Sequence, residues 1–161
     1  ESLEDILLIC SARYLPNGIF SLQTIADDSV DLIFSQAVLE HVRRYEFLET
    51  MKECHRILRN DGVASHRVDL KDHLGGGLNN LRFRESIWES NFFVRSGFYT
   101  NRIQFSEMIK VFEQAGFNIE SMNVDRWNVS PINRNSLSPD FALITNDDLL
   151  VKGFYAVMHP L

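Results

Sequence analysis

The stretch that decides the fold runs from Asp27 to Val42 and reads DDSVDLIFSQAVLEHV. An acidic turn precedes a nearly continuous apolar run from Val30 to Phe34, the pattern of a central parallel strand that is buried on both faces. A polar pair ends this strand, and a second apolar run that contains Glu40 and His41 follows. Open α/β sheets bind ligands outside the carboxyl ends of their strands, so this layout predicts a ligand site at the end of the strand.

The same stretch resembles the fourth strand and following helix of class I S-adenosylmethionine-dependent methyltransferases, which often carry a DLI-x-S-x-x-VLEHV-like sequence. The next segment supports the resemblance, because an amphipathic helix ends in ECHRILR at Arg59, a turn follows, and a strand begins at Val63. In the family this is the E-x-x-R-x-L-x-x-G-G region, with Asp61 here in place of the first glycine of the pair. The resemblance covers most of the chain from about Leu15 onward.

The beginning of the chain departs from the family pattern. The family's first strand and its glycine-rich turn, which hold the methionine part of the cofactor, have no counterpart, and none of the 8 glycines lies before Gly18. A second strand that ends in an acidic residue for the ribose hydroxyls is also missing. The resemblance therefore implies an α/β fold with a Rossmann-like methyltransferase sheet, mostly parallel with an antiparallel last strand, whose amino-terminal strands are missing. We expect residues 1–161 to form a single partial domain.

The spacing of apolar residues predicts the other elements. One helix is marked by a stripe from Tyr45 to Leu58 and ended by the turn at residues 60–62. A second is marked by Met108 and its neighbours, with Ser106 as its cap and Gly116 as its stop. The remaining expected elements are a helix over residues 3–10, a short strand over 12–15, strands over 63–70, 117–127 and 154–159, and a short helix over 147–151. The family topology places the last strand antiparallel beside the strand of residues 63–70.

Composition limits the classes of function. A chain of 161 residues with 45% hydrophobic content has enough apolar material for one core. The net charge of -6 disfavours a nucleic-acid or anionic-membrane surface, so we expect neither partner. Cys10 and Cys54 lie outside any C-x-x-C pattern and read as reduced thiols, which predicts a cytoplasmic location. No apolar run approaches the ~18 to 20 residues of a membrane-spanning helix, and the first residues lack the basic start of a signal peptide.

The resemblance also implies which residues bind S-adenosylmethionine. Ser35, Gln36 and Ala37 match positions that in the family contact the methionine end of the cofactor; alternatively, they only cap and solvate the connection after the strand. Methyl transfer chiefly requires alignment of acceptor and cofactor, and in some reactions the removal of a proton from the attacking atom. His41 could remove that proton, because histidine titrates near neutral pH. Alternatively, it orients the loop through a hydrogen bond.

The densest polar cluster spans residues 66–73 and reads HRVDLKDH. Side chains of a strand alternate between its two faces, with His66 and Val68 on one face and Arg67 and Asp69 on the other, so the cluster cannot all converge unless the strand ends near Asp69. At the strand exit, Asp69, Asp72 and His73 could contact a substrate beside the cofactor or belong to a solvated loop. Two histidines and two carboxylates also invite a divalent metal, but the spacing matches no compact metal motif, so we expect no metal site.

Three glycines at 75–77 open a stretch to about residue 101 that is rich in aromatic residues and arginine. In family terms this is an insertion or lid, at about 71–101, that covers the substrate, although most of its rings are expected in packed core. Tyr99, Asn101 and Arg102 could line the substrate pocket or serve the structure.

The function implied is S-adenosylmethionine-dependent methyl transfer to a small-molecule acceptor. The alternative is a non-catalytic, truncated methyltransferase-like module that acts through protein association. If the amino-terminal strands are absent, the strand at residues 30–34 lies at the edge of the sheet. Exposed apolar edges promote pairing, which predicts a homodimer that covers this edge or a rearranged packing.

Overall fold

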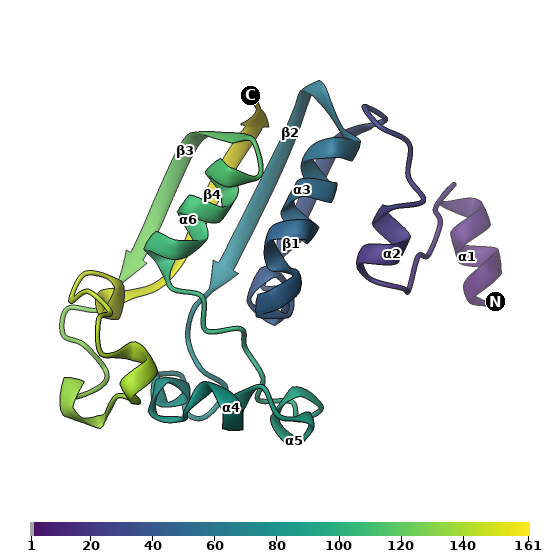
Figure 1. The fold of residues 1–161 in the computed structure, drawn as a ribbon. Helices are drawn as coiled ribbons and strands as arrows, with labels where there is room; N and C mark the ends of the chain where they lie inside the picture. The colour runs from purple at the N-terminus through teal and green to yellow at the C-terminus, as the bar shows by residue number, and fades with distance from the viewer. Residues whose placement is uncertain (1) are drawn as a thin grey trace.

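The computed structural model describes residues 2–161, which form a four-stranded sheet with helices on one face (Figure 1). The strands are β1 (Val30–Gln36), β2 (Leu58–Asp69), β3 (Phe117–Arg126) and β4 (Val151–Pro160), in the order β1-β2-β4-β3. β1 and β2 pair in parallel, whereas β4 runs antiparallel between β2 and β3. Three strands therefore point the same way and the last strand opposes them beside β2, which confirms the expected α/β topology.

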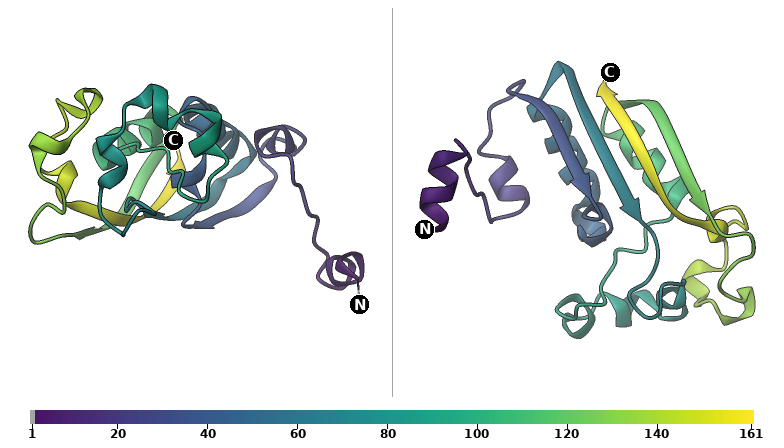
Figure 2. Two further views of the ribbon diagram at one scale, coloured as in Figure 1. Left: turned by 90° about the horizontal axis from the view of Figure 1, so that it is seen from below. Right: turned by 180° about the vertical axis from the view of Figure 1, so that it is seen from behind.

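The helices are α1 (Leu3–Ile9), α2 (Ile19–Leu22), α3 (Phe47–Ile57), α4 (Glu85–Trp88), α5 (Asn91–Val94) and α6 (Phe105–Gln114). Single turns of 3-10 helix span Leu39–His41, Arg44–Glu46, Asn79–Arg82, Arg134–Ser136, Pro139–Phe141 and Asp148–Leu150. α3 and α6 lie side by side over the same face of the sheet, and α1 lies apart from it (Figure 2). Within residues 2–161, no helix has the length and apolar character needed to cross a membrane.

The main core lies between α3, α6 and the sheet. α3 contributes Phe47 and Met51, and α6 contributes Met108 and Phe112, all of which are buried. The sheet supplies alternate side chains of β2 and β4 in register, Ala64 with Met158, His66 with Ala156 and Val68 with Phe154. Full burial of a large apolar side chain stabilises the fold by about 1.5–3 kcal/mol. The contact between the apolar faces of α3 and α6 and the sheet therefore accounts for the position of both helices.

A smaller core lies beyond the carboxyl ends of the strands. Leu78 and Leu81, from the segment after β2, pack with Ile132, Phe141 and Leu149 from the connection between β3 and β4. Figure 1 shows both segments below the arrowheads of β2 and β3. This second cluster holds the predicted insertion, residues 71–101, against the edge of the sheet where a ligand site is expected.

The second face of the sheet is uncovered in the described residues, as the left view of Figure 2 shows. The expectation of a strand buried on both faces is therefore wrong for β1, where Leu32 is 58% and Phe34 66% exposed. Both side chains point away from α3, since they alternate with Ile33 and Ser35, which pair with buried residues of β2. β1 also forms an edge of the sheet, the position expected if the amino-terminal strands are absent.

Two predicted helix boundaries are wrong. α3 ends at Ile57, because Leu58 already has an extended backbone and pairs with Val30. The turn expected at residues 60–62 instead lies within β2, where the register with β1 shifts. Ser106 does not cap α6, because its N–H and hydroxyl both donate to the carboxylate of Asp148.

The other sequence-based elements are located as expected, with one exception. Residues 12–15 form no strand; all four are exposed, and none of them pairs with a strand of the sheet. The helix over residues 3–10, the strands over 117–127 and 154–159, and the short helix over 147–151 are confirmed within one to three residues. Gly116, with φ of 97°, follows the end of α6 and confirms the predicted stop.

Candidate functional site

The candidate site lies where β1 and β2 end. At Ala37 the backbone adopts a left-handed conformation, with φ of 52°, and its N–H donates to the carbonyl of Arg67 at 2.9 Å. Non-glycine residues rarely adopt this conformation, and such positions concentrate at functional sites. The bend turns the chain off the strand and into the 3-10 helix that carries Glu40 and His41. Figure 1 shows the insertion crossing beneath this point.

The three residues expected to contact the cofactor have different environments. Ser35 points to the helix-covered face, where its hydroxyl hydrogen-bonds Nδ1 of His66 at 2.7 Å. The N–H of Ala37 is also occupied, by Arg67. Gln36 is exposed at the end of β1, on the uncovered face of the sheet. Of the three, Gln36 is thus the residue whose side chain is accessible to a ligand.

His41 and His73 come together although 32 positions separate them in the sequence. Their ring centroids lie 5.1 Å apart, and both side chains are exposed. Nδ1 of His41 lies 2.9 Å from the carbonyl oxygen of Tyr99, and Nδ1 of His73 lies 3.1 Å from that of Gly97. A carbonyl oxygen only accepts hydrogen bonds, so in each neutral ring Nδ1 carries the hydrogen and Nε2 keeps its lone pair.

The two aspartates at the end of β2 have different roles: Asp69 lines a cavity, and Asp72 orders the loop. Asp69 lines an open cavity of about 200 Å³ on the uncovered face, with Arg67, Lys71 and Tyr155 among its neighbours. The carboxylate of Asp69 accepts from the N–H of Lys71 at 2.9 Å. Asp72 is buried and instead accepts from the backbone N–H groups of residues 74 and 79, which orders the loop.

His66 is separated from this group. It is 1% exposed and lies on the helix-covered face of β2, between Ser35 and the ring of Phe112. Burial lowers its pKa to about 4, so it is neutral at physiological pH. As the alternation along the strand predicts, His66 and Asp69 lie on opposite faces, so His66 does not join Asp69 although β2 ends at that residue. In the described part of the chain, no three His, Cys, Asp or Glu side chains are grouped as metal ligands.

The turn that carries His41 is fastened to the end of the insertion. The buried side-chain amide of Asn101 donates to the carbonyls of Leu39 and Val42, both at 2.9 Å, and its own N–H donates to the carbonyl of Glu40 at 2.7 Å. Asn101 therefore binds three carbonyls of one turn, which keeps His41 and Tyr99 at hydrogen-bond distance. The backbone of the turn is thus placed by a residue about 60 positions away.

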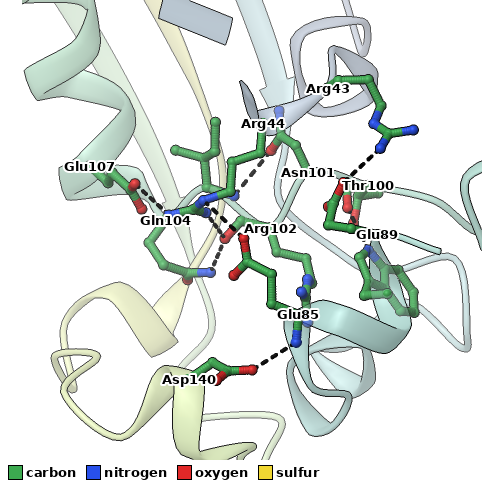
Figure 3. Close-up of polar contacts among 12 residues, drawn as sticks. Arg43, Arg44, Glu85, Glu89, Thr100, Asn101, Arg102, Gln104, Glu107 and Asp140 are labelled. Atoms are coloured by element: carbon green, nitrogen blue, oxygen red, sulfur yellow. Dashed lines mark hydrogen bonds and ion pairs between the residues drawn. The ribbon is translucent and has the colours of Figure 1, made fainter. Parts of the chain in front are cut away.

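Ion pairs extend this attachment (Figure 3). Arg43 pairs with Glu89 at 3.1 Å, and Arg44 pairs with Glu107 of α6 at 2.5 Å. Half-exposed ion pairs of this kind contribute about 0–1 kcal/mol each, so they orient the insertion more than they stabilise it. Arg102 lies among them without a carboxylate partner within ion-pair distance among the described residues.

Glu40 has the most perturbed carboxyl group at this site. Its side chain is 2% exposed, and burial raises its pKa to about 7. The negative charge of Asp69 raises the pKa further, while His73 opposes this effect. Perturbed carboxyl groups in a cleft are typical of functional sites.

Glu40 and His41 follow the strand directly, so their place at its end is predictable from the sequence. The contacts of the two histidines with the carbonyls of Gly97 and Tyr99 are not, because no local pattern marks a residue that acts through a contact with a distant turn. The one sequence signal was the polar sequence TNR at residues 100–102, directly before an amphipathic helix.

Residues 6–65 match the family model described as a methyltransferase domain. The match covers β1, the turn with Glu40 and His41, α3 and the first half of β2. None of the curated proteins matches the chain.

Several solved structures have a similar fold. A SAM-dependent methyltransferase from Methanosarcina mazei is 15% identical with a TM-score of 0.55, over 86% of this chain and 62% of that one. A Pyrococcus horikoshii protein is 12% identical with a TM-score of 0.55, over 98% and 65% of the two chains. A SAM-dependent methyltransferase from Archaeoglobus fulgidus is 12% identical with a TM-score of 0.50, over 98% and 72%. At these identities the likeness shows the fold, and this chain spans less than two thirds of the first two.

Proposed function

We propose that this chain forms part of an enzyme that methylates a small-molecule acceptor. The premise is that the chain belongs to the class I S-adenosylmethionine-dependent methyltransferases, by the match of residues 6–65 and by its sheet topology. The observation that carries the proposal is the pair of exposed histidines at the carboxyl end of the sheet, each with Nδ1 bound to a backbone carbonyl. We also propose a cytoplasmic location, which the two free cysteines support.

The cofactor supplies a methyl group on a positively charged sulfur, which is already activated for displacement. The residues at the end of β1 fit one side of such a group. The exposed amide of Gln36 can hydrogen-bond its polar part. Ser35 then acts indirectly, since its hydroxyl is used by His66.

In this proposal His41 accepts the proton of the acceptor hydroxyl or amine. Its Nε2 is the available basic atom, because Nδ1 donates to the carbonyl of Tyr99 and fixes the tautomer. His73, 5.1 Å away, and Asp69 contact the acceptor and orient it. General-base assistance of this kind contributes roughly 10²–10⁴-fold to the rate.

The insertion serves as a lid. It contributes the carbonyls of Gly97 and Tyr99 to the two histidines, and the second core holds its other end. Phe98, between those carbonyls, is 47% exposed and Phe92 is 76% exposed, which gives the lid apolar surface for an organic acceptor.

Calorimetric titration with S-adenosylmethionine and S-adenosylhomocysteine tests the proposal. We expect saturable binding that Gln36→Ala weakens at least several-fold. Gln114→Ala, an exposed glutamine at the opposite end of the sheet in α6, is the matched control and should bind as the unmodified chain does. Binding that Gln36→Ala leaves unchanged would remove the assigned cofactor contact, and a folded protein that binds neither compound would contradict the proposal for this chain.

A second function is supported by the uncovered sheet face. Leu32 and Phe34 expose apolar surface beside the unpaired edge of β1. Such an edge pairs readily with another chain, so the same residues support a module that acts through protein association, including as a homodimer. Light scattering separates these cases: a dimer that Phe34→Ser dissociates supports association, and a strictly monomeric particle counts against the homodimer.

A further inference from the structure

Three residues that line one small cavity each carry a buried polar atom without a hydrogen-bond partner among the described residues. The atoms are Oε2 of Glu40, Oδ1 of Asn80 and Nε of Arg102. The three residues are 2%, 2% and 5% exposed, and all three line a cavity of about 10 Å³ between the turn after β1 and the insertion. Buried polar atoms nearly always have a partner, so three such atoms around one cavity point to a bound group.

The chemistry of the three atoms defines what the cavity binds. The carboxylate oxygen and the amide oxygen are acceptors, and the Nε–H of the guanidinium is a donor. Oε2 of Glu40 and Oδ1 of Asn80 cannot bond each other directly when Glu40 is ionised, because both are acceptors. One water molecule can accept from Arg102 and donate one hydrogen each to Glu40 and Asn80. Three hydrogen bonds are typical of a buried water, and about 10–15 Å³ is the smallest volume that holds one.

Arg102 is held in place for this role. Its guanidinium lies between the rings of Trp88 and Phe141, with centroids at 5.3 and 4.9 Å. Nη1 donates to the carbonyls of Asn80 and Phe83, at 3.3 and 2.7 Å. Its backbone adopts a left-handed conformation, with φ of 56°. Because the ring contacts and these bonds hold the guanidinium in place, the direction of its Nε–H is fixed as well.

We propose that Glu40, Asn80 and Arg102 bind one internal water molecule, and that Glu40 is a positioning residue that couples its protonation, through this water, to the docking of the lid on the turn that carries His41. The inference rests on the proposed function, since it concerns the same site. The lid contributes Asn80, the segment between the lid and α6 contributes Arg102, the turn contributes Glu40, and the water joins them.

The charges around the cavity make Glu40 responsive near neutral pH. Asp69, at the end of β2, and Arg102, in the segment before α6, line the cavity with it, and His73 in the loop after β2 interacts with it. Burial and Asp69 favour the protonated carboxyl, and its pKa is raised to about 7. A carboxylate accepts a hydrogen bond from the water, whereas a carboxylic acid can donate one. The bonding of the water to Arg102 and Asn80 must therefore change as Glu40 titrates.

Nuclear magnetic resonance of the whole chain, without cofactor or acceptor, tests this inference. We expect a cross-peak between Nε–H of Arg102 and a long-lived water, and an inflection near pH 7 in the Nε–H shift. Glu40→Gln keeps an acceptor oxygen and the shape of the side chain, so it should keep the water and lose the inflection. Glu89→Gln, which removes the carboxylate paired with Arg43, is the control and should keep both.

Two results would overturn the inference. An Nε–H of Arg102 that shows no water cross-peak in the unmodified chain removes the water site, and this measurement needs no variant. An inflection that survives in Glu40→Gln assigns it to another group. Because this experiment contains no cofactor, neither result contradicts the proposed binding of S-adenosylmethionine. Failure of the calorimetric test likewise does not contradict the proposed water site.

Discussion

Replacement of Glu40 by glutamine should make the protein more stable at high pH and leave it little changed at low pH. The folded chain raises the pKa of Glu40 from 4.5 to about 7, so folding favours the protonated form. Stability is then fully present below the unfolded-state pKa of 4.5 and is lost as the pH rises through 7. At about 1.36 kcal/mol for each pH unit between these two values, the loss is about 3 kcal/mol.

Glutamine does not ionise, so Glu40→Gln should avoid this loss. The free energy of unfolding of the variant, relative to the unmodified chain, should rise by about 3 kcal/mol between pH 4.5 and pH 8. For a chain of this length the midpoint temperature should change by about 6–12 °C relative to the unmodified chain. Urea denaturation at the two pH values measures the difference, with Glu113→Gln, an exposed glutamate of α6, as the control. A difference that stays constant with pH, or falls, would refute the assignment of a raised pKa to Glu40.

Three further outcomes test the structure around the site. Asn101→Ala removes two side-chain hydrogen bonds to the turn after β1 and leaves buried carbonyls unpaired. The free energy of unfolding, measured by urea denaturation, should therefore fall by about 2–4 kcal/mol. A loss below about 1 kcal/mol would count against this attachment. Burial raises the pKa of Cys54 to about 11, so a thiol reagent at pH 8 should modify exposed Cys10 in the folded protein and Cys54 only after denaturation; equal rates for both thiols would contradict the buried position. Gly116→Ala should destabilise by more than about 1 kcal/mol, since φ is 97° and a Cβ would lie 2.8 Å from Nε2 of His55; unchanged thermal unfolding would show that the turn relaxes.

Elements marked by local periodicity were predictable. The apolar run at β1 and the stripes of α3 and α6 reflect spacings of residues that are neighbours along the chain, and the structure has these elements in place. Predictions from local sequence were wrong where a residue distant in the sequence provides the hydrogen-bond partner. Ser106 looks like a helix cap by itself, but the carboxylate of Asp148 accepts from it instead. Leu58 looks like the end of a helix, but it is a strand residue because β1 is there to pair with it.

The candidate site divides in the same way. The order of residues from Gln36 to His41 follows directly from a strand that ends and turns, so their place at the carboxyl edge was predictable from the sequence. The partners of these residues were not, because Tyr99, Asn101 and Arg102 reach the turn only through the folding of the insertion.

The sequence by itself determined the position of His41 after a strand end, because that follows from a short-range pattern of apolar and polar residues, and its resemblance to the methyltransferase family implied the class of fold and the antiparallel last strand. Only the tertiary structure decided which face of the sheet is covered, the tautomer of His41 and the burial of Glu40. These properties depend on which residues from distant segments come within a few ångströms. Burial and hydrogen-bond geometry, which set a pKa and a tautomer, exist only once the chain has folded.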